Sequence, residues 1–141
     1  MRKRVRAVAG ALAVLAFSFL TCTTWAAGYA RPELLIETEE LAKILNQPNV
    51  RLVDAVEPAS YQRAHLPGAV NVFYLDLGKI EERKKNGHPL SNAEAEKIFG
   101  EAGIDNNTQV IVYDGGEGPS ASGVWFVLDF FGHKNVKVLN G

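Results

Sequence analysis

The stretch TQVIVYDGGEGPSASGVW, residues 108–125, decides the fold. Residues 108–113 form the strongest predicted strand, and they are apolar on both faces, which is typical of a strand covered by helices on both sides of a parallel sheet. A turn with three glycines follows, and an apolar helical pattern runs from Ser120 or Ser122 to Phe131. A strand that passes through a glycine-rich turn into a helix is the repeating unit of an α/β fold.

The same alternation continues on both sides of this stretch. Thr38 caps a helix that breaks at Pro48, and Ser91 caps a helix in which Glu94 completes a capping box. The order of elements predicts an α/β fold of three layers, α/β/α, around a central, mostly parallel sheet of about five strands. The other predicted strands are residues 34–36, 50–55, 69–72 and 136–139, and further helical segments are predicted at 58–63, 75–85 and 91–102.

The loop after the strongest strand has some features of an anion pocket. Its glycines allow backbone N–H groups to approach a ligand closely, and it leads to a helix N-terminus at the carboxyl edge of the sheet. However, Asp114 and Glu117 bring negative charge into the same space, and the loop lacks the Gly-Lys-Ser/Thr of a P-loop. The loop comprises Asp114, Gly115, Gly116, Glu117, Gly118 and Pro119.

Two other segments carry residues that could take part in chemistry. Asp54 ends a strand with Glu57 three residues later, so the pair could share acid–base work, but a carboxylate that accepts turn N–H groups is the favoured interpretation. His65 stands beside the Pro67-Gly68 turn, where it is expected to pin the turn through a backbone carbonyl. No second His or Cys stands at metal-ligand spacing, so no metal site and no cofactor are predicted.

A phosphoryl-transfer site is an alternative for the loop. In that case Asp114 would be a nucleophile or a metal ligand, which requires an acidic partner and a nearby lysine. Asp54 could supply the partner, but the sequence places no lysine at a strand end. A single strand-end Asp is therefore weak support for this alternative.

Aromatic residues cluster in the helix after the loop, and they are predicted to be core rather than part of a cofactor site. The sequence ends at Gly141, directly after a predicted strand, where an α/β domain would normally continue into a covering helix. We therefore expect a domain truncated at its carboxyl end, with part of the packing surface missing from Trp125, Phe126, Phe130 and Phe131.

Residues 1–26 have the pattern of a secretory signal peptide. Four basic residues precede an apolar run at residues 7–20, and small residues at Thr24 and Ala26 fit a cleavage site after Ala26, with a site after Ala30 as the alternative. The run is short for a membrane-spanning helix, and Leu20-Thr21 before Cys22 fits a lipid-attachment signal poorly. Because Cys22 is the only cysteine, residues 27–141 would contain no thiol nucleophile and no disulfide.

The charge of the processed chain excludes several classes of partner. The whole sequence has 15 basic and 16 acidic side chains, and loss of four basic residues with the leader leaves 11 against 16, a net charge of −5. An acidic exported domain is not expected to bind nucleic acid or an anionic membrane.

Two blocks of the chain resemble the rhodanese family. Residues 52–72, LVDAVEPASYQRAHLPGAVNV, are similar to its segment that runs from a strand-end Asp to His-Ile-Pro-Gly-Ala, with Asp54, His65, Pro67 and Gly68 in matching places. Residues 108–141 resemble the second half of the same domain. The part between these blocks is similar to the longer, amino-terminal type of rhodanese domain found in tandem thiosulfate or 3-mercaptopyruvate sulfurtransferases.

The resemblance implies a function. Family members carry a persulfide on a cysteine at the end of the central strand, and Asp114 stands at that position here, so the loop 114–119 would be a pseudo-active site and this chain would be inactive. The resemblance implies a non-catalytic amino-terminal domain of a sulfurtransferase, and the leader at residues 1–26 predicts that this protein is exported, to the periplasm in a bacterium. Its partners would be a second, cysteine-bearing rhodanese domain and a small sulfur-containing substrate. A stand-alone exported binding module without catalysis is the alternative.

Overall fold

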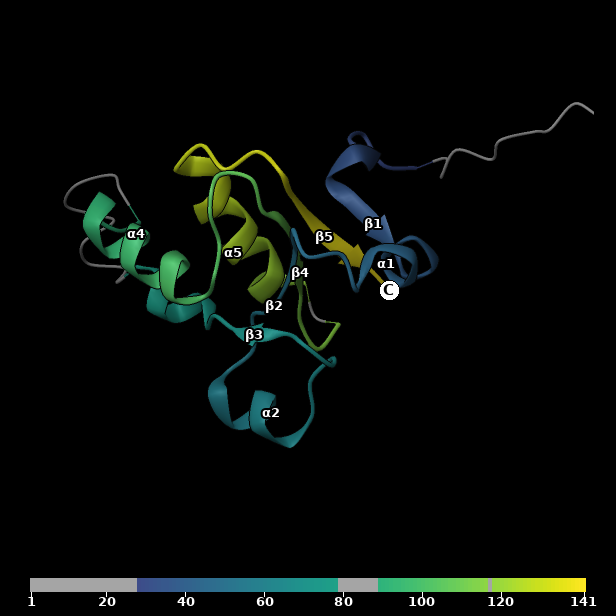
Figure 1. The fold of residues 1–141 in the computed structure, drawn as a ribbon, viewed down its shortest axis with the longest axis horizontal. Coiled ribbons are helices and arrows are strands. Elements are labelled where there is room, and N and C mark those ends of the chain that lie inside the picture. The colour runs from purple at the N-terminus through teal and green to yellow at the C-terminus, as the bar shows by residue number, and fades with distance from the viewer. Residues whose placement is uncertain (1–27, 79–88, 117) are drawn as a thin grey trace, which may run out of the picture.

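A computed structural model describes residues 28–78, 89–116 and 118–141. The strands form one sheet, and the helices pack around it (Figure 1). The strands are β1 (Leu35–Glu37), β2 (Val50–Asp54), β3 (Val70–Asn71), β4 (Gln109–Tyr113) and β5 (Val136–Asn140). The α-helices are α1 (Thr38–Ile44), α2 (Pro58–Arg63), α4 (Asn92–Glu101) and α5 (Pro119–Phe130), with short 3-10 turns η1 (Pro32–Leu34) and η2 (Tyr74–Leu77).

The sheet has five strands in the order β1-β5-β4-β2-β3. Every strand pairing within the described residues is parallel, so the prediction of a mostly parallel sheet of about five strands is confirmed. β4 lies in the middle, with Val112 paired to Val53 on one side and to Val138 on the other. The central position explains why the sequence of β4 is apolar on both faces.

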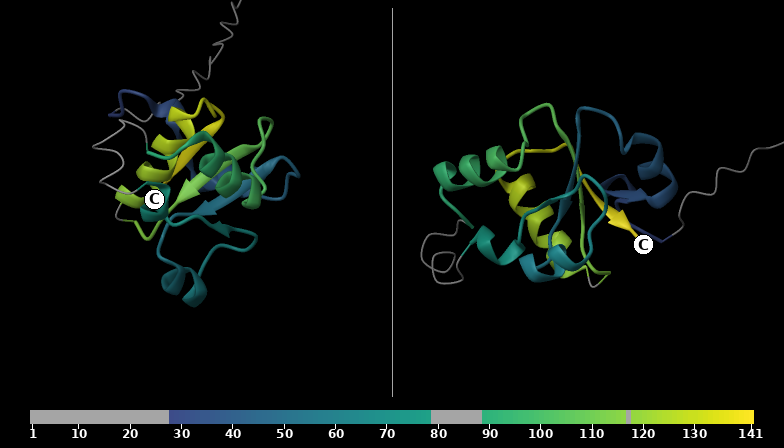
Figure 2. Two further views of the ribbon diagram at one scale, coloured as in Figure 1. Left: turned by 90° about the vertical axis from the view of Figure 1, so that its left-hand side faces the viewer. Right: turned by 60° about the horizontal axis from the view of Figure 1, so that its bottom comes forward.

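Helices cover both faces of the sheet, which gives the three predicted layers. Val110 and Val112 of β4 belong to an apolar cluster with α4 and α5, whereas Ile111 between them belongs to a second cluster with α1 and Tyr61 of α2. Figure 2 shows α4 and α5 on one side of the strands and α1 on the other. Successive side chains of a strand point to opposite faces, so alternate residues of β4 contribute to the two clusters.

Helix boundaries follow local capping chemistry. Ser91 caps α4 and forms the predicted capping box with Glu94, in which the Ser91 hydroxyl accepts the Glu94 N–H and the Glu94 carboxylate accepts the Ser91 N–H. Two other predictions are corrected. Thr38 is the first residue of α1 rather than its cap; the cap residue is Glu37, whose side chain makes no capping bond to the helix. α5 begins at Pro119, ahead of the predicted Ser120 or Ser122.

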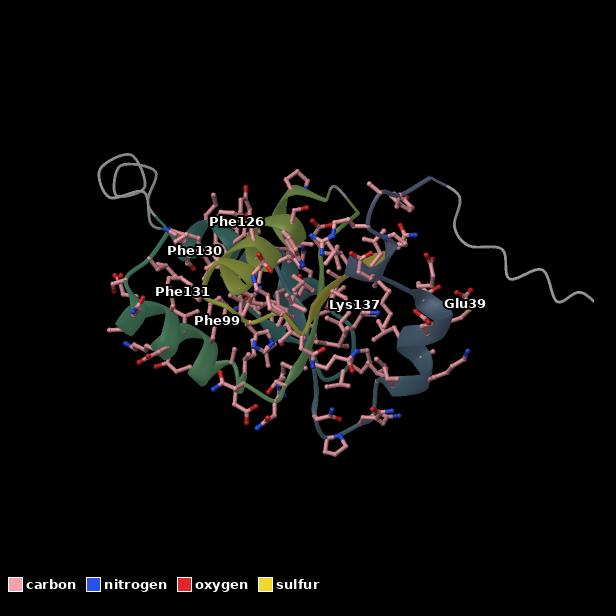
Figure 3. All side chains as sticks on the ribbon, turned by 90° about the horizontal axis from the view of Figure 1, so that it is seen from above. Glu39, Phe99, Phe126, Phe130, Phe131 and Lys137 are labelled. Atoms are coloured by element: carbon pink, nitrogen blue, oxygen red, sulfur yellow. The ribbon has the colours of Figure 1, made fainter. Side chains whose placement is uncertain are left out.

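The prediction that the aromatic residues of α5 and of its C-cap, Phe131, are core is wrong for two of them. Trp125 and Phe131 pack against the larger cluster, but Phe126 and Phe130 are 46% and 40% exposed. Figure 3 shows Phe126, Phe130 and Phe131 gathered along this helix, with Phe99 of α4 beside them. The helical repeat of 3.6 residues turns these neighbouring aromatics toward different sides, so only some of them face the sheet.

Some predictions lie outside the described residues. These are the signal peptide at residues 1–26, Cys22, and the greater part of the helix predicted at 75–85, of which the described residues show only η2. Within the described ranges, no helix is both long and apolar enough to cross a bilayer.

Candidate functional site

Three neighbouring strands bring their carboxyl ends together at one edge of the sheet. Asp54 at the end of β2 is paired with Tyr113 of β4 on one side and with Asn71 of β3 on the other. The Asn71 side-chain amide donates to the carbonyl oxygens of Asp54 and Val56, at 3.0 and 2.8 Å, and so ties β3 to the end of β2. The glycine-rich loop leaves β4 directly after Tyr113 at this same edge, where parallel α/β sheets keep their binding sites.

The Asp114 carboxylate lies within a cradle of backbone N–H groups. One oxygen, Oδ1, accepts the N–H groups of Gly116 and Gly118 at 2.9 and 3.2 Å, and Oδ2 accepts that of Ala121 at 3.0 Å. Gly116 and Gly118 have φ angles of 95° and 81°, which side chains other than glycine rarely adopt. The glycines therefore let the loop fold back so that its donors meet at one carboxylate.

These donors hold Asp114 in its ionised form. Partial burial works to raise the pKa of this carboxyl, but the N–H groups of Ala121, Gly116, Gly118 and Ser120 outweigh it, so the pKa lies below the ordinary value. The N-terminus of α5 adds partial positive charge on the same side. A fixed negative charge thus occupies the place in which a helix N-terminus could otherwise receive an external anion.

A cavity of about 440 Å³ opens beside this loop. Asp114 and Gly115 form one wall, and Glu57 and Ser60 from the start of α2 form another. The rest of the described lining comes from the first turn of α5, from the turn after Asp54 and from the segment around η2: Ser120, Val56, Phe73, Tyr74 and Leu75. The cavity therefore brings Glu57 and Asp114, which are far apart in the sequence, to a common space.

Asp54 stabilises the turn at the carboxyl end of β2, and it is not among the described residues that line the cavity. Its side chain is 2% exposed, and its Oδ1 accepts the Val56 N–H at 3.1 Å, as a turn-supporting carboxylate does. Burial raises the pKa of the adjacent Tyr113 hydroxyl; the Leu66 N–H opposes this rise, and the Asp54 carboxylate adds to it. The structure thus does not bring Asp54 and Asp114 together as an acidic pair facing the cavity.

His65 and the Pro67-Gly68 turn follow the C-terminal end of α2 and lead into β3. The His65 Nδ1 is 2.8 Å from the Tyr61 carbonyl oxygen, and the two rings stack with centroids 4.0 Å apart. Gly68 has a φ angle of 81°, and the Leu66 carbonyl accepts the Ala69 N–H across the turn. These contacts hold the turn between α2 and β3.

A metal site is not evident from the side chains that could form one. In residues 28–78, 89–116 and 118–141, no three His, Cys, Asp or Glu side chains gather in a way that could hold an ion. Of the loop residues named from the sequence, Glu117 lies outside the described part of the chain.

The chain matches a known domain over most of its length. The sequence profile of the Rhodanese-like domain matches residues 37–141. The chain belongs to the rhodanese family. This rhodanese domain is 46% identical over 83 residues to thiosulfate/3-mercaptopyruvate sulfurtransferase 2 of Arabidopsis thaliana, covering 57% of this chain and 23% of that protein. It is 35% identical over 123 residues to thiosulfate sulfurtransferase of Rattus norvegicus, covering 76% of this chain and 40% of that protein.

A solved structure agrees with the fold of this rhodanese domain. The 3-mercaptopyruvate sulfotransferase SseA from Escherichia coli superimposes with a TM-score of 0.64 at 26% identity, over 78% of this chain and 41% of that one. The rhodanese domain spans between 23% and 40% of the length of the two curated relatives. The predicted three-layer rhodanese fold is therefore confirmed.

Sequence reasoning about the rhodanese domain missed several residues of the site. Tyr113 accepts the Leu66 N–H at 2.8 Å through its hydroxyl. Phe73 and Tyr74 line the cavity, and they follow β3 in a segment whose sequence contains no motif that indicates a functional site. An aromatic residue at the end of a strand is a common core pattern, so nothing local distinguished these residues.

Proposed function

We propose that this rhodanese domain is the non-catalytic, amino-terminal half of an exported two-domain sulfurtransferase that takes sulfur from thiosulfate or 3-mercaptopyruvate. The observation that carries the proposal is the Asp114 carboxylate within its cradle of three backbone N–H donors. It stands where the family resemblance places the cysteine that accepts sulfur. The domain would support the fold of its partner and form one wall of the cleft between them.

The chemistry explains why this substitution abolishes transfer. A sulfurtransferase cysteine attacks as a thiolate and holds the transferred sulfur in an S–S bond, and N–H donors at a helix N-terminus lower its pKa. The same donors stabilise the Asp114 carboxylate, but an oxygen acid has no sulfur with which to form a persulfide. The surrounding loop would thus keep the shape of a sulfur-transfer site while lacking its nucleophile.

The lengths and names of the relatives support a second domain. Two curated relatives are sulfurtransferases of which this chain covers 23% and 40%, which leaves room in each for at least one further domain of this size. The nucleophilic cysteine and the binding site for the small sulfur substrate would lie in that second domain. Residues 1–26, with their basic start and apolar run, would direct export of the protein.

A sulfur-transfer assay tests the proposal. The chain is incubated with thiosulfate or 3-mercaptopyruvate and with cyanide as acceptor, and thiocyanate is measured. We expect no transfer above the rate in buffer, because the described cradle holds a carboxylate. The Cys22→Ser variant is the matched control, since Cys22 is the only cysteine of the sequence. Turnover that persists in Cys22→Ser and disappears in Asp114→Ala would refute the proposal.

A further inference from the structure

Two hollows adjoin at the carboxyl edge of the sheet and form a groove with two different ends. The first is the cavity of about 440 Å³ that Glu57 and Asp114 line. The second, of about 310 Å³, lies between η2 and α5, with Pro119 and Phe126 in its wall. Tyr74 and Leu75 line both hollows, so we name the two together the loop groove.

One end of the loop groove is acidic. Glu57 and Asp114 both line it, and none of the described residues that line either hollow is a Lys, Arg or His. Backbone donors lower the pKa of Asp114, so its carboxylate is charged at neutral pH. These charges oppose the entry of an anion such as thiosulfate and favour a cation, because unlike charges attract most strongly where solvent is partly excluded.

The other end of the loop groove is apolar and exposed. Leu75 is 56% exposed and Phe126 is 46% exposed, although large apolar side chains are more often buried. Exposed apolar side chains that adjoin a polar rim are typical of surfaces that bind another polypeptide. An occupant that matches both ends must therefore carry a positive charge beside an apolar side chain.

We propose that the loop groove receives a protein segment in which an arginine adjoins an apolar side chain, and that the second domain of the parent protein supplies it. The guanidinium group would lie near Glu57 and Asp114 and pack on the aromatic side chains Phe73 and Tyr74. These two rings meet edge to face, with their centroids 5.4 Å apart. Arginine suits this place because its planar group pairs with carboxylates and stacks on rings. The apolar neighbour would pack on Leu75 and Phe126. Only the source of the segment rests on the proposed function.

A cation of the domain itself already stands near the acidic end. Arg63 in the last turn of α2 donates to the Ser60 hydroxyl at 2.8 Å, and that hydroxyl donates to Glu57 at 3.2 Å. Arg63 thus contributes positive charge near Glu57, through the hydroxyl that both contact, and competes with an incoming guanidinium. Removal of Arg63 is expected to strengthen binding, whereas removal of the Glu57 charge is expected to weaken it.

Peptide titration followed by NMR tests the inference. The probe is N-acetyl-leucyl-arginine amide, and the matched control is the same peptide with neutral citrulline in place of arginine. Saturable shifts are expected at the amides of Gly115, Ser120 and Gly123. The arginine peptide should bind about three- to fivefold more tightly than the citrulline peptide, as for a partly exposed charge pair.

Three variants sharpen the test. Glu57→Gln should reduce the preference for arginine to less than about twofold, and Arg63→Gln should raise the affinity for the arginine peptide. Glu96→Gln, on α4 and away from the loop groove, should change neither. Well-dispersed amide signals show that each variant is folded.

Two outcomes would overturn the inference. One is equal affinity for the arginine and citrulline peptides, and the other is no saturable shift at the loop groove at ~10 mM peptide. Neither outcome touches the proposed function, which depends on the absence of sulfur transfer. Conversely, thiocyanate formation that depends on Asp114 would refute the proposed function and leave the charge of the loop groove as it is.

Discussion

At the end of β4, a carboxylate replaces the thiol that the family resemblance leads one to expect. The sequence alone indicates this substitution, because Asp114 is adjacent to an unmistakable strand. The hydrogen bond from the Leu66 N–H to the Tyr113 hydroxyl could not be predicted from the sequence, because it joins residues 47 positions apart. Local pattern predicts which residue follows a strand, but contacts between distant segments depend on how the strands are ordered.

The charge of Asp114 contributes to stability, and its loss should be visible against pH. The folded-state pKa is depressed below the ordinary 3.8, so the contribution is present above that value and is lost as pH falls through the folded pKa. Asp114→Asn should therefore lower the free energy of unfolding by about 1 kcal/mol at neutral pH, after allowance for solvent screening. Urea unfolding at several pH values measures this.

The difference between the two proteins should shrink below the ordinary Asp pKa, where the native carboxyl becomes protonated. A difference that stays constant down to the acid limit would mean that the bonds of the carboxylate do not depend on its charge. Asp129→Asn, which removes a partly exposed carboxylate that pairs with Lys134 at 2.8 Å, serves as the control.

Element boundaries were predictable where side chains form caps and less so where backbone conformation decides. The capping box of α4 was evident because Ser91 and Glu94 have the required spacing. The start of α5 was placed too late because serine is a common cap. In the structure, Gly118 adopts a φ of 81° and Pro119, with its fixed φ, occupies the first turn.

The capping box of α4 gives a prediction at this scale. Ser91→Ala removes the hydroxyl that accepts the Glu94 N–H at 3.3 Å, and it should lower the free energy of unfolding by about 1 kcal/mol. Ser91→Thr keeps a hydroxyl, so its free energy of unfolding should fall much less. Chemical denaturation of the three proteins would decide, and equal midpoints for Ser91→Ala and the native chain would show that the cap contributes nothing.

The molecule as a whole consists of one sheet with an apolar cluster on each face. Alternation of strands and helices predicted the parallel sheet and its layers. The order β1-β5-β4-β2-β3 was not predictable from that alternation, because the pairing of β1 with β5 joins the two ends of the described chain. Long-range pairing of this kind depends on packing rather than on local propensity.

The two clusters should respond independently to substitution within one cooperative unit. Ile36→Val, in the smaller cluster, should cost about 1 kcal/mol, and Val124→Ala, in the larger one, about 2 kcal/mol. The double variant should lose the sum within about 0.5 kcal/mol, in a single transition. Two separate transitions, or a strongly non-additive loss, would contradict a single domain built on both faces of one sheet.

The central claim is that the backbone N–H donors of an anion-binding loop surround a carboxylate, which cannot carry the transferred sulfur. The pKa of a thiol placed at position 114 tests this claim most directly. In an Asp114→Cys chain that also carries Cys22→Ser, the rate of thiol alkylation is followed against pH. The donors from Gly116, Gly118 and Ala121 should lower the thiol pKa by at least about one unit from the usual ~8.5. A thiol that titrates at or above ~8.5 would contradict the account.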